Sequence, residues 1–263
     1  MLPSAVRSVF ASDLHMGNKW SHYRELHHFL KEIEEPEHLY LVGDIIDGWS
    51  FRRGWHWSQE NNNFVRKVLS LAKHGCHVHY LVGNHDDFLL HYVGQEFGQL
   101  RLSRETVHTT ADGRRFLVMH GDQFDLIAKA APILYMLGDV GYAILLRLNL
   151  VINAVRRMLR RPHWSFSMWA KQRTKQMVNF LVDYENLITR YAAERNCDGV
   201  ITGHTHTPVI KQVGDVLYVN CGDFQEQATA VVEHFDGRLE LIDLCAASLE
   251  RAEETAVPAS PAA

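Results

Sequence analysis

The sequence predicts an α/β fold in which buried strands alternate with amphipathic helices. Short runs rich in Val, Leu, Ile and Phe recur along the chain, and Gly or Asp bounds each of them, which is typical of buried strands. Patterns with helical spacing separate the first three runs. A polar cluster containing Asp, Asn or His follows most runs, and ligands of α/β sheets gather at the carboxyl ends of the strands. The same edge of the sheet is therefore expected to collect these polar residues.

The first part of the chain has a strand, helix, strand, helix, strand pattern. Strands are expected at residues 6–11, 39–42 and 77–82. Helices are expected at residues 23–33 and 64–72, because apolar residues recur there on one helical face. Further strands are expected at residues 115–119, 199–202, 216–220, 229–235 and 239–244. Asp236-Gly237 between the last two predicts a hairpin turn.

The segment at about 126–191 breaks this rhythm and predicts a helical cap inserted between two strands of the core. Its most apolar part, residues 130–155, is interrupted by Asp139 and Arg147, so no uninterrupted span of about 20 apolar residues exists to cross a membrane. Residues 1–247 are thus expected to form a single domain that carries this insertion. Ala, Glu, Pro and Ser dominate residues 248–263 without periodicity, which predicts a disordered tail.

Composition narrows the class of protein. Hydrophobic residues make up 46% and charged residues 22% of the chain, as in an ordinary globular protein. The formal net charge of −4 gives no general attraction to nucleic acid. The four cysteines lie far apart and form no CxxC pair, which favours reduced thiols. The apolar run at residues 9–11 is too short for a signal peptide. A cytoplasmic protein is expected.

The polar clusters supply seven side chains with oxygen or nitrogen donors and no thiolate. They are Asp13, His15, Asp44, Asn84, His120, His204 and His206. Such a set suits Mn²⁺, Fe or Zn²⁺ rather than Cu(I) or an iron–sulfur cluster. It is too many ligands for one ion and a natural number for two ions that share a carboxylate. Two ions about 3.5–4 Å apart can clamp the attacking and leaving oxygens of a phosphoryl displacement.

Five sequence blocks occur in the order seen in calcineurin-like metallophosphoesterases. They are Asp13-x-His15, Gly43-Asp44, Gly83-Asn84-His85-Asp86, His120 and Gly203-His204-x-His206. The chain resembles that superfamily, which implies a four-layer αββα sandwich of two facing sheets flanked by helices, with two divalent ions at one edge.

The resemblance also implies a role for each residue. Asp13, His15 and His206 would bind the first ion, and Asn84, His120 and His204 the second, with Asp44 bridging the two. His85 would stabilise charge on the scissile phosphate or protonate the leaving oxygen, and Asp86 would orient His85. An imidazole suits that task because its ordinary pKa lies near neutrality. Asp47 and Asp122 could orient ligands or cap turns.

Within the superfamily, the chain is most similar to the UDP-2,3-diacylglucosamine diphosphatases of lipid A biosynthesis. The runs Gly43–Trp49 and Asn220–Phe224 and the long insertion support this. The resemblance implies hydrolysis of UDP-2,3-diacylglucosamine, or a related nucleotide-linked lipid, to lipid X and UMP, with Mn²⁺ as the expected metal. One departure is His85, because established members of the group resemble Gly-Asn-Arg-Asp at this block.

The insertion suggests contact with an anionic lipid. Its apolar face is followed by clustered basic residues, which suits a lipid head group or a peripheral contact with the inner membrane surface. Lys171 and Lys175 lie one helical turn apart and could reach a diphosphate together, with Arg173 between them. The same residues could equally be a packed core and a solvated helix face. Trp49, Trp55 and Trp57 could cover the site or pack beneath the cap.

Two other functions compete with a lipid-linked diphosphatase. The first is a metallophosphoesterase for a soluble nucleotide or another phosphodiester; confinement of the basic residues to the cap argues against a nuclease. The second is a non-catalytic scaffold, against which the intact ligand set and His85 argue. The oligomeric state and the metal used in the cell do not follow from the sequence.

Overall fold

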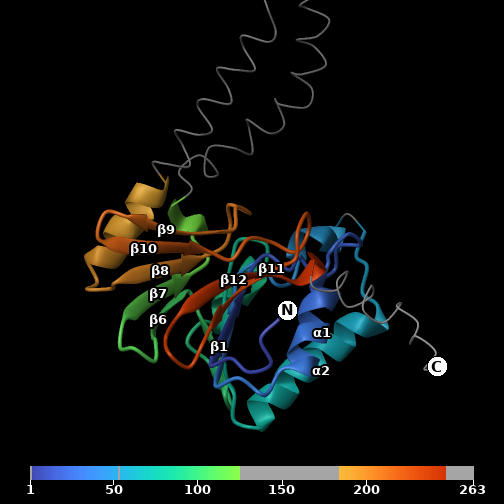
Figure 1. The fold of residues 1–263 in the computed structure, drawn as a ribbon. Coiled ribbons are helices and arrows are strands. Elements are labelled where there is room, and N and C mark those ends of the chain that lie inside the picture. The colour runs from blue at the N-terminus through green and yellow to red at the C-terminus, as the bar shows by residue number, and fades with distance from the viewer. Residues whose placement is uncertain (1, 53, 125–183, 247–263) are drawn as a thin grey trace, which may run out of the picture. The chain divides into compact units, whose positions relative to one another are not determined.

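The computed structural model describes residues 2–52, 54–124 and 184–246 (Figure 1). The chain divides into two compact units, residues 1–122 with 188–263 and residues 123–187. Both sheets belong to the first unit. Most of the predicted cap, the basic residues Lys171, Arg173 and Lys175, and the predicted tail lie outside the described residues and stay predictions.

One sheet has seven strands in the order β12-β11-β1-β2-β3-β5-β4. The strands are β1 (Ser8–Ala11), β2 (His38–Val42), β3 (His77–Leu81), β4 (Glu96–Phe97), β5 (Leu100–Ser103), β11 (Thr229–Glu233) and β12 (Leu239–Asp243). Strands β1, β2, β3 and β5 are parallel, whereas β11 runs antiparallel to β1. The carboxyl ends of β1, β2 and β3 therefore meet at one edge of the sheet.

The second sheet has five strands in the order β6-β7-β8-β10-β9. These are β6 (Glu105–Thr109), β7 (Arg115–Met119), β8 (Gly199–Thr202), β9 (Val209–Val213) and β10 (Val216–Asn220). Strands β7, β8 and β10 are parallel, and β6 and β9 pair antiparallel at the two edges.

Alternate residues of the central strands face different cores. Val9 and Ala11 of β1 pack with the helices, whereas Phe10 between them packs against the other sheet. The helical core includes Leu26 of α1 (Tyr23–Glu32) and Phe64 of α2 (Gln59–Lys73). Figure 1 shows both helices on the same side of the seven-stranded sheet. Two buried cores sandwich that sheet, which explains its nearly continuous apolar strands.

A further helix includes residues 188–193 of the unit that holds the sheets, and Tyr191 of this stretch contacts the five-stranded sheet. The hydroxyl of Tyr191 donates a hydrogen bond of 3.0 Å to Glu105 of β6. The layers are thus helices, sheet, sheet and helix, and the predicted αββα sandwich is confirmed. In the described part of the chain, no helix has the length and apolarity needed to span a bilayer.

The structure confirms the predicted strands, and no strand end differs by more than two residues from its prediction. The predicted hairpin is also present, with Gly237 at φ 85° between β11 and β12. The sequence analysis did not identify β4, β5, β6 and β9. It also missed three short 3-10 helices, η1 (Gly48–Arg52), η2 (Asp87–Tyr92) and η3 (Asp122–Phe124). Those strands are edge strands or lie next to one, and their half-exposed residues lack the continuous apolar pattern of the central strands.

Candidate metal centre

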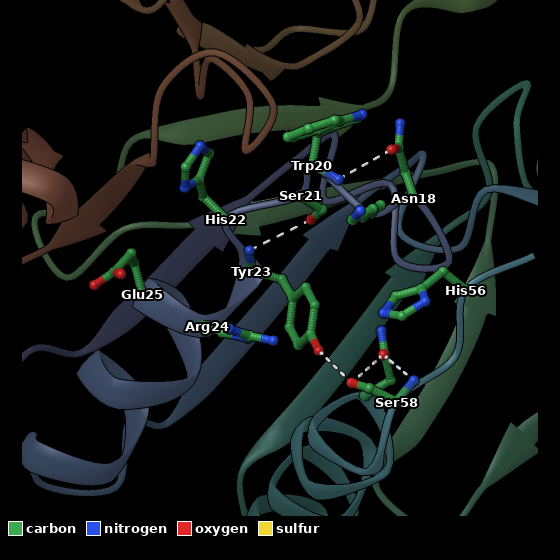
Figure 2. A pocket seen from close by; sticks show the side chains of 11 residues that line it. Asn18, Trp20, Ser21, His22, Tyr23, Arg24, Glu25, His56 and Ser58 are labelled. Carbon is green, nitrogen blue, oxygen red and sulfur yellow. Dashed lines mark hydrogen bonds between the residues drawn. The ribbon is translucent and has the colours of Figure 1, made fainter.

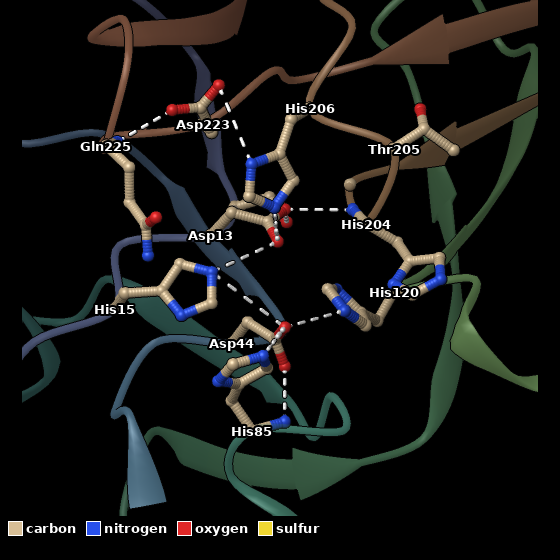
Figure 3. A network of polar contacts seen from close by, with 12 residues as sticks. Asp13, His15, Asp44, His85, His120, His204, Thr205, His206, Asp223 and Gln225 are labelled. Atoms are coloured by element: carbon tan, nitrogen blue, oxygen red, sulfur yellow. Dashed lines mark hydrogen bonds and ion pairs between the residues drawn. The ribbon is translucent and has the colours of Figure 1, made fainter. Parts of the chain in front are cut away.

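The predicted ligands lie on loops that leave the carboxyl ends of strands in both sheets. Asp13 and Asp44 follow β1 and β2, and Asn84 follows β3. His120 follows β7, and His204 follows β8. Because the two sheets face each other, these loops converge on one site, and Figure 3 shows several imidazole rings directed at the carboxylates of Asp13 and Asp44.

The backbone is strained at several of the predicted ligand residues themselves. Six described residues other than glycine have positive φ, and five of them are predicted ligands. These are Asp13 (55°), His15 (46°), Asp44 (54°), His204 (67°) and His206 (53°). Such conformations are costly for side chains with a Cβ atom and persist only where the surrounding structure enforces them. At these residues the backbone turns sharply after the strand, and this turn directs the ligand side chain into the centre.

Two motif glycines make room for this convergence. A Cβ atom on Gly83 would lie 2.2 Å from Oδ1 of Asp44, and one on Gly203 would lie 2.4 Å from Oδ2 of Asp13. Any larger residue would displace a carboxylate. These glycines are therefore needed for close approach to the two acids.

Asp13, His15 and His206 form one candidate ligand group. Oδ1 of Asp13 lies 3.1 Å from Nε2 of His206 and 3.7 Å from Nε2 of His15. One donor atom from each of the three lies within 4.8 Å of the others. Asp13 is fully buried, and its Oδ2 accepts a hydrogen bond of 2.9 Å from the backbone N–H of His204. The carboxylate is thus fixed with one oxygen turned toward the two imidazoles.

Asp44 and His120 form the centre of a second group. Nε2 of His120 lies 3.3 Å from Oδ2 of Asp44 and 3.3 Å from Oδ1 of Asn84. The His204 ring lies edge-on to that of His120, with the ring centroids 5.2 Å apart. One donor atom from each of Asp13, Asp44 and His120 also lies within 4.8 Å of the other two. Asp44 also belongs to a group with His15 and His85, so it stands between the two sides of the centre.

Several atoms of the site fit a bound cation. Within the described residues, Oδ1 of Asp13 and both ring nitrogens of His15 are buried and have no hydrogen-bond partner. Leaving such groups unsatisfied costs free energy, and a coordinated ion removes that cost. The donors are carboxylate oxygens, an amide oxygen and imidazole nitrogens, which suit divalent transition metals. The residues present therefore fit divalent ions.

Electrostatics point to the same requirement for positive charge. Burial alone would lower the pKa of His120, but Asp44 and Asp13 outweigh it and raise that pKa to about 10. Burial alone would raise the pKa of Asp13, but His120, His15 and His206 hold that pKa well below its usual range. Two buried carboxylates this close need compensating cations. Protonated imidazoles can supply this positive charge, and so can bound divalent ions.

His85 lies beside the carboxylate between the two groups. Its Nε2 atom lies 4.0 Å from Oδ2 of Asp44, and its Nδ1 atom lies 3.0 Å from Oδ1 of Asp47. Because a carboxylate only accepts, Nδ1 of His85 carries the proton in this contact. Burial would raise the pKa of Asp47, but the hydrogen bonds from His85 and Ser50 lower it to about 2. Asp47 thus fixes the ring so that Nε2 faces the centre.

Asp86 makes different contacts from those that the sequence analysis assigns to it. Its carboxylate accepts hydrogen bonds from the N–H of Gly83 at 2.5 Å and of Ile45 at 2.9 Å, and from Tyr80 Oη at 2.8 Å. The side-chain contact with His85 comes from Asp47 instead. Asp86 therefore supports the loop that carries His85, and the carboxylate that contacts the His85 ring is that of Asp47.

Two positioning contacts were not assigned from the sequence. Nδ1 of His120 lies 3.0 Å from the carbonyl oxygen of Val42, which leaves Nε2 free for a ligand bond. Oδ2 of Asp223 lies 3.8 Å from Nδ1 of His206, while its Oδ1 accepts backbone N–H bonds from Gln225 and Glu226. The only sequence signal for Asp223 was its place in a run that resembles the family. Asp122 pairs with Arg104 at 3.0 Å.

A polar pocket of about 290 Å³ begins beside the His15 turn. The N–H of Asn18 donates to the carbonyl of His15 at 3.0 Å, so the pocket wall and the ligand share one turn. Figure 2 shows Tyr23 reaching across to Ser58, with their oxygens 3.4 Å apart. The lining residues are Asn18, Lys19, Trp20, Ser21, His22, Tyr23, Arg24, Glu25, His56, Ser58 and Asn61.

Comparisons with known proteins agree with this geometry. The calcineurin-like phosphoesterase family profile matches residues 6–208. A curated relative from Vibrio cholerae, named UDP-2,3-diacylglucosamine hydrolase, is 25% identical over 79% of this chain and 84% of its own length. A relative of the same name from Blochmanniella pennsylvanica is 23% identical over 78% of this chain and 81% of its own length. A third from Porphyromonas gingivalis is 30% identical, but the match covers only 43% of this chain and 45% of the relative.

Solved structures with a similar arrangement include the phosphoesterase YfcE from E. coli. It is 17% identical, with a TM-score of 0.42 over 90% of this chain and 98% of that protein. An archaeal phosphodiesterase is 14% identical, with a TM-score of 0.43 over the same shares. The family profile spans most of this chain, including all seven predicted ligands. The chain belongs to the calcineurin-like phosphoesterase family.

Proposed function

We propose that this protein is a two-metal diphosphatase that hydrolyses a phosphoanhydride bond in a nucleotide-linked lipid of the UDP-2,3-diacylglucosamine type, releasing UMP and lipid X. The observation that carries the reaction class is the position of Asp44, whose carboxylate belongs to candidate ligand groups on both sides of the centre. A carboxylate shared by two ions would hold them at the short separation that a two-metal phosphoryl-transfer site needs.

Each ligand has a place in this proposal. The first ion would be held by Asp13, His15 and His206 and the second by Asn84, His120 and His204, with Asp44 between them. When bound, the two ions supply Lewis-acid charge to the phosphoryl oxygens and lower the pKa of the attacking water. Mn²⁺ is the proposed metal, because it accepts the carboxylate and amide oxygens of this set, and Fe or Zn²⁺, which the four imidazoles also suit, are the alternatives.

His85 would act on the reacting phosphate from the open side of the centre. Its Nδ1–H donates to Asp47, so its Nε2 atom is the one that can hold or transfer a proton near Asp44. A proton on Nε2 would stabilise the negative charge of the transition state or pass to the leaving oxygen. Asp47 would hold the ring in this orientation, since its carboxylate accepts from Nδ1–H at 3.0 Å.

The substrate proposal rests on the names of the relatives and on the long segment between the two halves of the ligand set. Relatives that share about 80% of their length with this chain are named UDP-2,3-diacylglucosamine hydrolase. Lys171, Arg173 and Lys175 are proposed substrate contacts within that segment. A role in lipid A synthesis, a cytoplasmic location and a peripheral contact with the membrane are parts of the same proposal.

His85 supports a second candidate, a phosphoesterase for a soluble nucleotide or another phosphodiester. The established diphosphatases resemble Gly-Asn-Arg-Asp at this block, whereas this chain has histidine. The difference lies beside the shared carboxylate, where it would alter contact with the substrate.

Hydrolysis by the purified full-length protein with Mn²⁺ distinguishes these candidates. The substrates are UDP-2,3-diacylglucosamine, UDP-glucosamine without acyl chains, and bis(p-nitrophenyl) phosphate. A preference for the acylated substrate with release of UMP supports the proposal. Cleavage of the aryl ester alone would replace it with the second candidate, and no metal-dependent cleavage of any of the three would favour the scaffold.

A further inference from the structure

Trp49 stacks on the ring of His85, which also contacts the predicted metal ligand His15. The indole and imidazole rings are stacked at 3.9 Å between centroids, with their planes 28° apart. The His15 ring meets His85 edge-on at 4.5 Å. A row of three rings therefore runs from a metal ligand to the surface. Trp49 is its outer member and remains 52% exposed.

The stacked position of Trp49 is enforced by its neighbours in the chain. Asp47 binds Nδ1 of His85, and the N–H of Gly48 donates to the carbonyl oxygen of His85 at 2.9 Å. Gly48 has no space for a side chain, because a Cβ atom there would lie 2.7 Å from that same carbonyl oxygen. Three consecutive residues thus contact His85 through a carboxylate, the backbone and an indole ring. The open face of Trp49 is held in a fixed orientation beside the catalytic centre.

Three other exposed rings lie close to one another, and one of them, Phe88, lies beside Gly48, the neighbour of Trp49 in the chain. Phe51 of η1 is 51% exposed, and Trp55 and Phe88 are each 38% exposed. The Phe51 ring lies 4.4 Å from that of Trp55 and 5.4 Å from that of Phe88. Singly exposed aromatic residues are common, but a contiguous group beside a catalytic site indicates a binding surface. We call Trp49, Phe51, Trp55 and Phe88 the aromatic surface.

We propose that the open face of Trp49 stacks against the nucleobase of the substrate. This inference rests on the proposed function, because it places the nucleotide's phosphate at the metal centre next to His85. In a nucleotide only the ribose separates the base from that phosphate, so the base reaches the nearest exposed ring. One face of the Trp49 indole is stacked on His85, so its other face can stack on a nucleobase. Bases stack on aromatic side chains in this way. An acyl chain has no flat face with which to continue the stack.

The experiment compares two ligands that differ only by the base. UMP and ribose 5-phosphate are titrated by calorimetry into the full-length protein loaded with Mn²⁺. UMP is expected to bind more tightly by about 5- to 150-fold, the range that stacking of one base covers. In Trp49→Ala this preference is expected to vanish, while the affinity for ribose 5-phosphate stays the same. Trp49→Phe keeps a ring and should retain part of the preference.

Phe235→Ala is the matched control. Phe235 is 60% exposed and follows β11 at the opposite end of the seven-stranded sheet from the metal centre. This variant should bind both ligands like the unaltered protein. Mn²⁺ content and near-ultraviolet circular dichroism of the Trp49 variants show whether the fold and the ions are retained.

The outcomes separate this inference from the proposed function. Equal affinities for UMP and ribose 5-phosphate, no binding of either, or a preference that survives Trp49→Ala would overturn the stacking, even if hydrolysis is observed. An acyl chain would instead be the ligand of the aromatic surface under two conditions. The preference for UMP survives Trp49→Ala, and the same variant no longer binds dodecyl phosphate more tightly than methyl phosphate. A base preference lost in Trp49→Ala supports the stacking even where no hydrolysis of the three substrates is detected, in which case the proposed reaction alone fails.

Discussion

Nε2 of His120 lies 3.3 Å from Oδ2 of Asp44, although the two residues follow strands of different sheets. Asp44 follows β2 of the seven-stranded sheet, and His120 follows β7 of the five-stranded sheet. The second ring nitrogen of His120 lies 3.0 Å from the carbonyl oxygen of Val42, the last residue of β2. The metal centre is therefore built at the seam between the sheets, and its geometry depends on how they face each other.

Asp44→Asn should remove nearly all activity. The carboxylate belongs to two candidate ligand groups, so its replacement weakens both ion sites. A loss of about 10³-fold or more in kcat/KM is expected, because metal charge contributes several kcal/mol to the transition state. The measurement is steady-state hydrolysis with metal analysis of the same sample. Asp112→Asn, which alters a partly exposed carboxylate in the β6–β7 turn, is the control, and turnover near that of the control would contradict the shared ligand.

His85→Gln should lower kcat and leave both ions bound. A loss of about 10²- to 10⁴-fold is expected for removal of a general acid. The structure also places His85 in a group with His15 and Asp44, so metal analysis distinguishes the two roles. Loss of an ion in this variant would make His85 a ligand. Asp47→Asn should give a smaller decrease in kcat, since the imidazole remains but loses the carboxylate that fixes its orientation.

Asp223→Asn should weaken metal binding at the site that includes His206. The carboxylate lies 3.8 Å from Nδ1 of His206 and would fix the orientation of that ring. Replacing such a partner lowers metal affinity by about 10- to 100-fold. Isothermal titration with Mn²⁺ should show one weakened site and one unchanged site. Two unchanged sites would mean that Asp223 only holds the turn at Gln225 and Glu226.

Glu233 should make the fold sensitive to acid. It is buried, with Oε1 2.8 Å from Arg7 and Oε2 2.8 Å from His108. Burial would raise the pKa of Glu233, but hydrogen bonds from His108 and Ser8 lower it to about 2 from an ordinary value of 4.5. A lowered pKa in the folded state stabilises the protein above pH 4.5, and this stabilisation is lost as the pH falls toward 2.

Urea unfolding of Glu233→Gln tests that account. At pH 7 the variant should be less stable by about 3 kcal/mol, because Arg7 and His108 lose a buried partner. The difference from the unaltered protein should shrink as the pH is lowered from 5 toward 2, since protonation removes the same charge. Exposed Glu226→Gln is the control. A difference that is constant over this range would attribute the loss to packing alone.

The sequence predicted the central strands and the ligand set for clear physical reasons. Strands buried on both faces, such as β2, are continuously apolar, and polar residues placed directly after them must meet at one edge. The edge strand β9 was not predicted, because its residues are half-exposed and follow no such apolar pattern. The contact of Asp47 with His85 and that of Asp223 with His206 join loops from different strands, so no local pattern reveals them. The positive φ of Asp13 and Asp44 arises from the convergence of both sheets and likewise has no local signature.

The central claim is that one centre holds two ions that share Asp44. Electron paramagnetic resonance of the Mn²⁺-loaded protein, combined with metal analysis, tests it most directly. The account predicts two Mn²⁺ per chain with an exchange-coupled signal, because ions about 3.5–4 Å apart that share a carboxylate interact magnetically. In Asp44→Asn the coupled signal should disappear. One Mn²⁺ per chain, or two without coupling, would contradict the two-metal centre.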